Sequence, residues 1–223
     1  YEVDISKKDN VYEFFNDISK RNICIKALIN AAGVQKPIGC FISSDYDEWC
    51  NNISINLFGA INMIHGFLNQ KNLVKYSKII NFSGGGATSS RPNFSSYAIS
   101  KTALIRFTEI IADELNKEKI NINAIAPGAI NTAMLDEVLE AKSLAGDEYF
   151  LAKKRVLDGG DPIEKTIELV NFLISDQSNN ISGKLISAVW DNYKNDDFLN
   201  RLESDPDFCC LRRIDKSIYD KIK

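Results

Sequence analysis

Short apolar runs alternate with amphipathic segments along most of the chain, and this alternation restricts the fold more than any other feature. The apolar runs end at glycine, proline or small polar residues, as buried strands do. They predict strands at 23–29, 78–83, 120–126 and 183–189.

Between these runs, apolar side chains recur at helical spacing. This periodicity predicts helices over 11–18, 53–68 and 96–115, and a fourth from 163. The last helix has a start signal in Asp161-Pro162-Ile163-Glu164, where Asp161 would cap the helix and Glu164 would complete a capping box. Its expected buried face consists of Ile167, Val170, Leu173 and Ile174.

Strands joined by crossover helices predict an α/β fold with a doubly wound parallel sheet. Ligands bind such sheets beyond the C-terminal ends of the strands, where Gly33, Ser83 and Pro127 each follow a strand. The length of 223 residues fits one domain. We expect residues 1–190 to form the body of that domain and 191–223 to be its C-terminal tail. The polar stretch 133–160 is expected to be an irregular, mobile substrate loop or lid.

Composition excludes several classes of function. The net charge is −3 and the basic residues are scattered, which argues against nucleic acid as a partner. No apolar run approaches the roughly 20 residues that cross a bilayer, and no signal sequence is evident, so a cytoplasmic protein without membrane contact is expected. The five cysteines lack metal-site spacing and are expected to be buried free thiols, with no metal bound.

A tyrosine and a lysine four residues apart lie on one face of a helix, where the ammonium can lower the pKa of the phenol. Tyr97 and Lys101 have this spacing, but so do Tyr149 and Lys153, and Tyr219 and Lys223. Only the first pair follows a strand, a glycine-rich turn and a serine, and opens a long helix.

In that setting, Tyr97-Ala98-Ile99-Ser100-Lys101 resembles the active-site segment of the short-chain dehydrogenases/reductases. Further matches to the family follow its order: Asp4 in residues 3–6, the segment 30–33, Asn56, and the segment 127–132. The resemblance covers residues 3 to about 190. It implies a Rossmann-like sheet, NAD or NADP as cofactor, a small-molecule substrate and a homo-oligomer.

The resemblance also implies residue roles. Tyr97 would donate or accept the proton, Lys101 would hold the nicotinamide ribose and lower the pKa of Tyr97, and Asn56 would anchor a relay water. Cofactor contacts would come from Asp4 at the adenine, from Ala31 and Gly33, and from Pro127, Gly128, Ile130 and Thr132 near the nicotinamide. Asn30 would steady the sheet.

The chain departs from the family at the serine that polarises the substrate oxygen. The usual position holds Gly84, and Ser83 lies one residue earlier. Since neighbouring side chains at a strand end point to opposite faces, this shift matters. Ser83 is the favoured donor, with Ser95, Ser96 or a water as alternatives.

A second departure is that the sheet is expected to lack its first strands and the glycine-rich phosphate loop, because the chain opens at Tyr1 in the segment that ends the family's third strand. A fragment of a longer protein is expected, with an open edge at 23–29 that favours aggregation and with weak nucleotide binding. The residue that selects NAD or NADP is not identifiable.

The leading interpretation is an NAD(P)-dependent oxidoreductase that transfers a hydride between nicotinamide and a small carbonyl or alcohol. A non-catalytic dinucleotide-binding protein or inactive fragment is the alternative, because of Gly84 and the missing phosphate loop. A sugar-nucleotide epimerase or dehydratase also carries the tyrosine and lysine pair, but it usually has a larger C-terminal domain than the chain offers.

Overall fold

Four parallel strands form the central sheet, and their order in space is their order along the chain. A computed structural model describes residues 1–71 and 73–215. The strands are β1 (Ala27–Asn30), β2 (Lys78–Phe82), β3 (Asn121–Ala126) and β4 (Leu185–Ser187). Each pairs in parallel with its neighbour, and Ala27 opposite Lys78 sets the first register. The predicted α/β fold with a parallel sheet is confirmed, although each strand is shorter than its apolar run.

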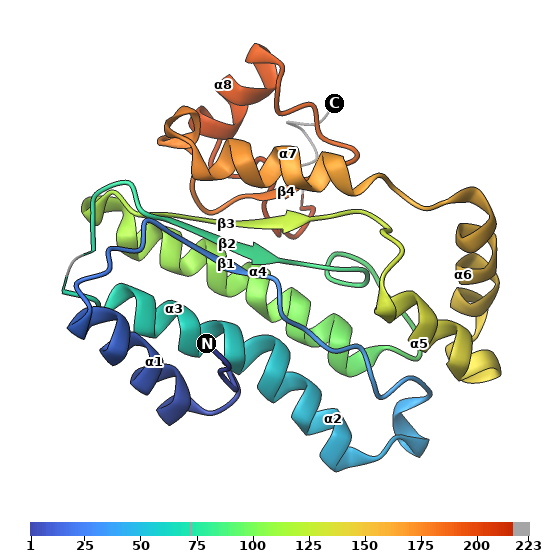
Figure 1. Cartoon of the computed structure of the whole chain (residues 1–223). Coiled ribbons are helices and arrows are strands. Elements are labelled where there is room, and N and C mark those ends of the chain that lie inside the picture. The colour runs from blue at the N-terminus through green and yellow to red at the C-terminus, as the bar shows by residue number, and fades with distance from the viewer. Residues whose placement is uncertain (72, 216–223) are drawn as a thin grey trace.

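Helices cover both faces of the sheet, as a parallel sheet requires. On one face lie α1, α2, the π-helical turn η2, α3 and α4, while α7 crosses the other face and α8 lies on the same side (Figure 1). Their bounds are Lys8–Lys20 for α1, Tyr46–Ile53 for α2, Ser54–Gly59 for η2, Ala60–Leu68 for α3, Ser95–Leu115 for α4, Ile163–Ile174 for α7 and Asp196–Ser204 for α8. Short 3-10 turns occur at Phe41–Ser43, Asn116–Glu118, Lys142–Ala145 and Asp176–Ser178.

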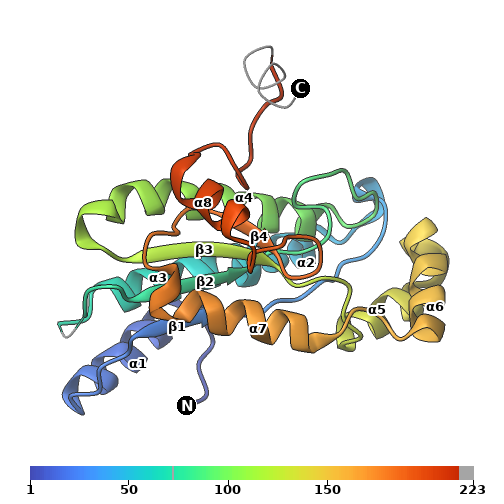
Figure 2. The same cartoon turned by 90° about the horizontal axis from the view of Figure 1, so that it is seen from above.

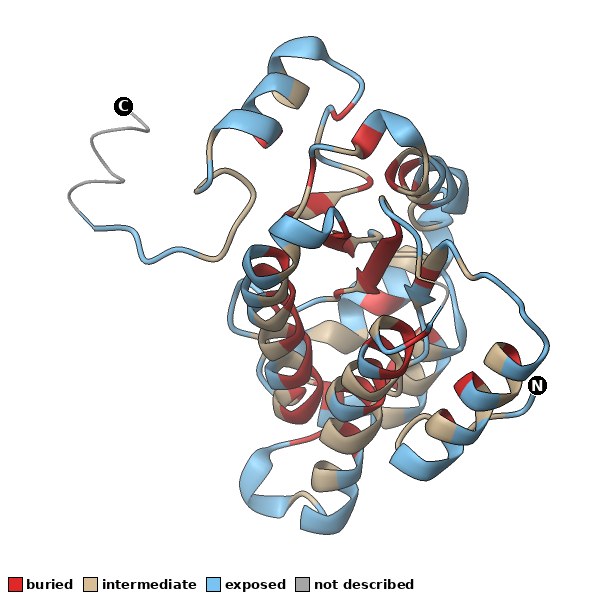
Figure 3. Cartoon of the chain, turned by 90° about the vertical axis from the view of Figure 1, so that its left-hand side faces the viewer, coloured by how far each residue is buried: buried red, intermediate tan, exposed pale blue. Residues whose placement is uncertain are grey.

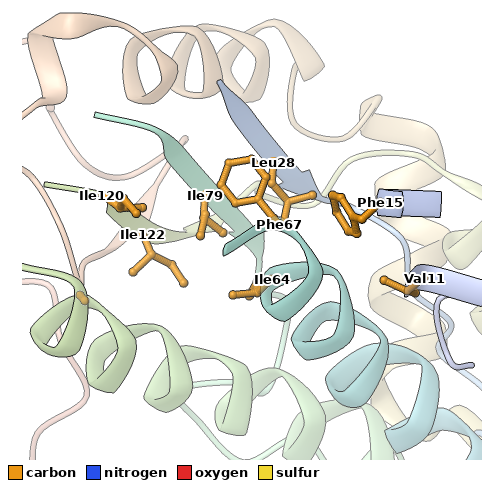
Figure 4. Packing of buried hydrophobic residues seen from close by; sticks show 9 residues of the cluster. Val11, Phe15, Leu28, Ile64, Phe67, Ile79, Ile120 and Ile122 are labelled. Carbon is orange, nitrogen blue, oxygen red and sulfur yellow. The ribbon is translucent and has the colours of Figure 1, made fainter. Parts of the chain in front are cut away.

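Alternate residues of each strand enter different cores, because side chains alternate across a sheet. Ile79 belongs to the core under α1, α3 and α4, whereas its neighbour Ile80 belongs to the core under α7. Figure 4 shows the first of these cores, in which Phe15 and Phe67 pack against Leu28 and Ile79. Strands β2 and β3 are almost completely buried, while the edge strand β1 is partly exposed and the helices expose their outer faces (Figure 3).

The segment 133–160 was predicted to be irregular, and this prediction is wrong. It folds into α5 (Ala133–Ala141) and α6 (Asp147–Asp158), which lie beyond the C-terminal ends of the strands in both views (Figures 1 and 2). Leu135, Val138 and Ala152 are buried in a small core of their own with Phe94. The apolar residues of this core are scattered among charged ones, so the segment shows no clear helical periodicity in the sequence.

The predicted start of α7 is also wrong in detail. Pro162 rather than Asp161 is the N-cap residue, and no side chain caps the helix. The carboxylate of Asp161 instead accepts a hydrogen bond from the backbone N–H of Ala129, 2.6 Å away. Most of the predicted buried face is confirmed, since Leu173 is buried and Val170 and Ile174 pack against the same core. Ile167 is instead half-exposed, and Thr166 and Leu169 are buried.

Two further expectations need correction. None of the cysteines is buried: Cys24 and Cys40 are exposed, and the other three are partly exposed free thiols. The tail 191–223 contains α8, and the pair Tyr219 and Lys223 lies outside the described residues. Within the described residues, no helix is both long and apolar enough to cross a membrane.

Candidate active site

The first turns of α4 place Tyr97 and Lys101 beside the C-terminal end of β2. Both side chains are buried: Tyr97 is 6% exposed and Lys101 is 3% exposed. The Lys101 Nζ lies 5.7 Å from the centroid of the Tyr97 ring and donates to the carbonyl oxygen of Phe82, the last residue of β2, at 2.9 Å. The strand end therefore fixes the lysine, and the helix fixes the tyrosine beside it.

Spacing alone does not produce this environment. Tyr149 and Lys153 on α6 also approach each other, with the Nζ 4.6 Å from the ring centroid, but Lys153 is exposed to water. Burial separates the two pairs, because Lys101 is enclosed by protein whereas Lys153 faces water.

Burial acts on both titratable groups of the α4 pair. It raises the pKa of Tyr97, and the positive charge of Arg91 opposes this rise. It lowers the pKa of Lys101 to about 8. Lowering of the Tyr97 pKa by Lys101 stays a prediction, since burial is the larger influence on this pKa and Arg91 is the cation that opposes it.

Gly33 lies where the loop after β1 meets Lys101 and the η2 turn. A Cβ at Gly33 would lie 3.0 Å from Asn56 Oδ1, 3.5 Å from Lys101 Nζ and 3.6 Å from Met134 Cε. The missing side chain leaves bare backbone next to the amine, so a ligand can approach closely at this point. Three of the residues singled out by the sequence, Gly33, Asn56 and Lys101, are therefore brought together.

Asn56 is buried in η2, the single π-helical turn between α2 and α3. Its Oδ1 accepts from the backbone N–H of Val34, and its Nδ2 donates to the carbonyl oxygen of Val34, both at 2.8 Å. The Nδ2 also donates to Asn52 Oδ1 at 2.8 Å. π turns are rare and often occur at functional sites. Here the π turn holds the Asn56 amide against the loop that follows Gly33.

Gly84 occupies the position of the family's serine, and the structure gives a steric reason. A Cβ at Gly84 would overlap the Tyr97 hydroxyl and would lie 2.8 Å from Cζ of that ring. The tyrosine hydroxyl therefore fills the space of a side chain at position 84. A serine there would have to displace the phenol.

The serines around this turn differ in their surroundings. Ser83 is 5% exposed, and its backbone N–H donates to the carbonyl oxygen of Ile125 at 2.8 Å. Ser95 accepts from the indole N–H of Trp49 at 2.9 Å. Ser96 is buried, and its hydroxyl has no hydrogen-bond partner within the part of the chain that the structure describes.

The segment after β3 forms a braced turn. Gly128 has a φ of +90°, which favours glycine, and the carboxylate of Asp161 closes the turn through Ala129. Thr166 of α7 donates to the carbonyl oxygen of Pro127 at 2.8 Å. Ile130 and Thr132 follow and lead into α5, whose second residue is the Met134 that faces Gly33.

The remaining cofactor candidates lie at the edge of the site. Asn30 donates to Asn81 Oδ1 at 2.9 Å, and Asn81 donates to Thr108 of α4, so these amides tie the strand ends to the helix. Ala31 is exposed. Asp4 accepts from the backbone N–H and the hydroxyl of Ser6, which lowers the pKa of its carboxyl, and no contact joins it to the residues around Lys101 within the described chain.

The sequence interpretation missed Arg91. Its guanidinium donates to Gln35 Oε1 at 3.2 Å and to Glu148 Oε2 at 3.0 Å, and its Cζ lies 5.8 Å from the centroid of the Tyr97 ring. The available signal was a single basic residue between the glycine turn and Tyr97.

A family model and individual relatives each match most of the chain. The family described as "Enoyl-(Acyl carrier protein) reductase" matches residues 1–188. The 3-oxoacyl-[acyl-carrier-protein] reductase FabG of Thermotoga maritima is 26% identical over 186 residues, which cover 83% of this chain and 73% of the relative. The short-chain dehydrogenase/reductase aba4 of Botryotinia fuckeliana is 32% identical over 190 residues, covering 83% and 72%.

Solved structures extend the likeness to the fold. The aldohexose dehydrogenase of Thermoplasma acidophilum superimposes with a TM-score of 0.73 at 25% identity, over 84% of this chain and 75% of the other. An NAD⁺-bound xylitol dehydrogenase gives a TM-score of 0.74 at 22% identity over 84% and 76%.

Proposed function

The chain belongs to the short-chain dehydrogenase/reductase family of NAD(P)-dependent oxidoreductases, and from this premise we propose that Tyr97 and Lys101 carry out its proton transfer. The observation that carries the proposal is their joint burial at the end of β2, with Lys101 bonded to the carbonyl oxygen of Phe82. A proton donor excluded from bulk water, next to an open ligand approach at Gly33, is what carbonyl reduction needs.

The residues around Gly33 fit a nicotinamide dinucleotide. A side chain at this position would fill the space next to Asn56 and Lys101, and its absence leaves a cradle for a planar group and a ribose. Lys101 would bind the ribose hydroxyls, and Pro127, Gly128, Ile130 and Thr132 would hold the carboxamide through the braced turn. Asp4 and Ala31 would contact the adenosine end, with Asn30 supporting the sheet beneath it.

When bound, the nicotinamide supplies or accepts the hydride. In reduction, the carbon of the substrate carbonyl gains that hydride, the C=O π pair moves onto the oxygen, and the Tyr97 hydroxyl gives this oxygen its proton. In oxidation, the tyrosinate accepts the proton back. Lys101 stabilises the phenolate between these states, and Asn56 holds a water through which Lys101 exchanges protons with solvent.

The substrate is a small carbonyl compound or the corresponding alcohol. A 3-oxoacyl thioester is the first candidate, because two relatives at 26% and 29% identity are 3-oxoacyl-[acyl-carrier-protein] and acetoacetyl-CoA reductases. The helices α5 and α6, placed beyond the strand ends, would form the wall of the substrate pocket.

We also propose a homo-oligomer. Ile99 and Ile110 are half-exposed, eleven residues apart on α4. Eleven residues make about three helical turns, so both side chains lie on one face of the helix. A second copy that covers this face would bury them, and light scattering of the purified protein measures the resulting mass.

The function is tested by nicotinamide absorbance with NADH or NADPH plus acetoacetyl-CoA, and with NAD⁺ or NADP⁺ plus D-glucose or xylitol. The variant Tyr97→Phe loses turnover by about 10²- to 10⁴-fold, since the hydroxyl serves proton transfer, while nucleotide affinity by calorimetry stays nearly unchanged. Turnover at the parent rate would remove Tyr97 from the mechanism. Nucleotide binding with no turnover of any pair by the parent would favour a non-catalytic binding protein.

Ser83 is the candidate for polarising the substrate oxygen alongside Tyr97. The variant Ser83→Ala lowers the rate by roughly 10- to 1000-fold if this hydroxyl is the donor. An unchanged rate assigns the task to another group, such as Ser95, Ser96 or water.

A further inference from the structure

Arg91 is the strongest unexplained feature near the candidate site. It lies in the loop between β2 and α4, and its side chain is 13% exposed. Its Cζ lies 3.9 Å from the centroid of the buried Phe94 ring. Hydrogen bonds to Gln35, from the loop after β1, and to Glu148, from α6, fix the guanidinium from two other parts of the chain. A long cationic side chain is rarely held this firmly without a use.

The glycine turn brings this guanidinium to the reacting end of Tyr97. At Gly84, the side-chain position is filled by the Tyr97 hydroxyl. At the adjacent Gly85, a Cβ would lie 3.5 Å from both Cζ and Nη1 of Arg91. The phenol and the guanidinium therefore flank two consecutive residues of one turn, which has no side chains to separate them.

On the basis of the function proposed above, we propose that Arg91 is a further catalytic residue, whose guanidinium donates a hydrogen bond to the substrate oxygen that Tyr97 protonates. This oxygen gains negative charge as the hydride reaches the carbonyl carbon. A charged N–H donor stabilises such an oxygen more strongly than a neutral hydroxyl. The guanidinium remains protonated throughout, so the only proton that moves to the substrate comes from Tyr97.

The donor count allows this contact. A guanidinium has five N–H groups, and the bonds to Gln35 and Glu148 use one each. Gln35 is itself anchored, because its Nε2 donates to the carbonyl oxygen of Met134 at 3.0 Å. Met134 also faces Gly33, so the network that holds Arg91 is continuous with the proposed nicotinamide cradle.

The competing explanation is that Arg91 only clamps α6 through Glu148. The two explanations differ in what they require of Glu148. A clamp needs both partners equally, so removing either would cost the same. A substrate contact needs the guanidinium itself and depends on Glu148 only for its position.

The experiment measures kcat and KM for Arg91→Gln, Arg91→Lys and Glu148→Gln in the full chain, with acetoacetyl-CoA or whichever panel substrate the parent turns over fastest. Arg106→Gln is the matched control, since it removes another Arg–Glu pair, between the half-exposed Arg106 and the buried Glu109 of α4. We expect Arg91→Gln to lower kcat by about 10²- to 10³-fold with nucleotide affinity unchanged, and Arg91→Lys to recover part of the loss. In a further variant, Arg91→Ala, added guanidinium ion should partly restore kcat.

Two results would overturn the proposal while leaving the function intact: a kcat for Arg91→Gln equal to that of the control, or an equal loss in Glu148→Gln. A further arm needs no turnover. NMR of chains with ring-labelled tyrosine, assigned with Tyr97→Phe, follows the titration of Tyr97. Its pKa should rise in Arg91→Gln and not in Arg106→Gln, and an unmoved titration would count against Arg91 even in a chain that reduces nothing.

Discussion

The two ends of strand β2 each hold a buried lysine, and the comparison separates a candidate catalytic amine from a structural one. Lys78 begins the strand and is 1% exposed, while Lys101 meets its last carbonyl and is 3% exposed. Burial lowers the pKa of both amines to about 8. By burial and pKa alone the two sites are indistinguishable.

Their hydrogen bonds distinguish them. The Nζ of Lys78 donates to Asn121 Oδ1, Ser178 Oγ and Asn179 Oδ1, at 3.0, 3.1 and 2.8 Å. An ammonium has three donors, so this one is saturated by neutral oxygens. Lys101 makes one hydrogen bond within the described residues, to Phe82. A shifted pKa therefore marks a functional lysine only when donors remain for a ligand.

The largest expected effect is a difference in activity between variants of the two lysines. Lys101→Met should lower kcat/KM by about 10²- to 10⁴-fold, because the phenolate loses its cation and the ribose loses a donor. Lys78→Met should leave kcat/KM per folded molecule unchanged. Steady-state kinetics with a circular-dichroism check of folding measures both, and equal losses would mean that the saturated lysine also serves catalysis.

The second prediction concerns the crowding at the catalytic end. Gly84→Ala should lower kcat by about 10²-fold, because its Cβ displaces the Tyr97 hydroxyl from its place. The neighbouring Gly85→Ala is a milder comparison, since its Cβ would touch the proposed catalytic Arg91 at an ordinary 3.5 Å without overlapping any atom. Steady-state kinetics of both variants test this prediction. Equal kcat values would show that the Tyr97 phenol can move aside without loss of activity.

The sequence predicted the catalytic end better than the opposite end. A tyrosine and a lysine four residues apart need only a helix to face one side, and a strand followed by glycine locates a loop, so Tyr97, Lys101 and Gly33 could be placed from local patterns. Lys78 could not be recognised as buried, because its acceptors come from β3 and from residues about a hundred positions away. Arg91 was missed for the same reason, and Asp161 was assigned as a helix cap because its actual partner, Ala129, is distant in the sequence.

The third prediction tests the structural lysine through stability. Lys78→Met should lower the free energy of unfolding by about 1–3 kcal/mol, because three buried oxygens lose their donor. Urea unfolding of parent and variant measures the change. A more stable variant would show instead that the cost of burying the amine exceeds the value of its hydrogen bonds.

The last prediction is a pH dependence of that difference. The pKa of Lys78 is about 8 in the folded chain and 10.5 in an ordinary lysine, so the folded chain binds fewer protons between these values. Stability due to Lys78 therefore rises from about pH 8 to about pH 10.5 and is constant below that window. Between about pH 8 and pH 10.5, the free energy of unfolding of the parent should therefore rise relative to that of Lys78→Met. A difference that stays constant over this range would contradict a lowered pKa of Lys78.

The π turn η2 ties the position of Asn56 to the number of residues in the segment 54–59. Such a turn contains one residue more than the α-helical path it replaces, and each helical residue turns the chain by about 100°. Deleting one residue of 54–59 would let α2 and α3 join as a regular α-helix, and Ile64 and Phe67 would keep their places in the core beside β1. Such a single-codon deletion would therefore spare the fold but remove the bulge that holds Asn56 against the loop after Gly33.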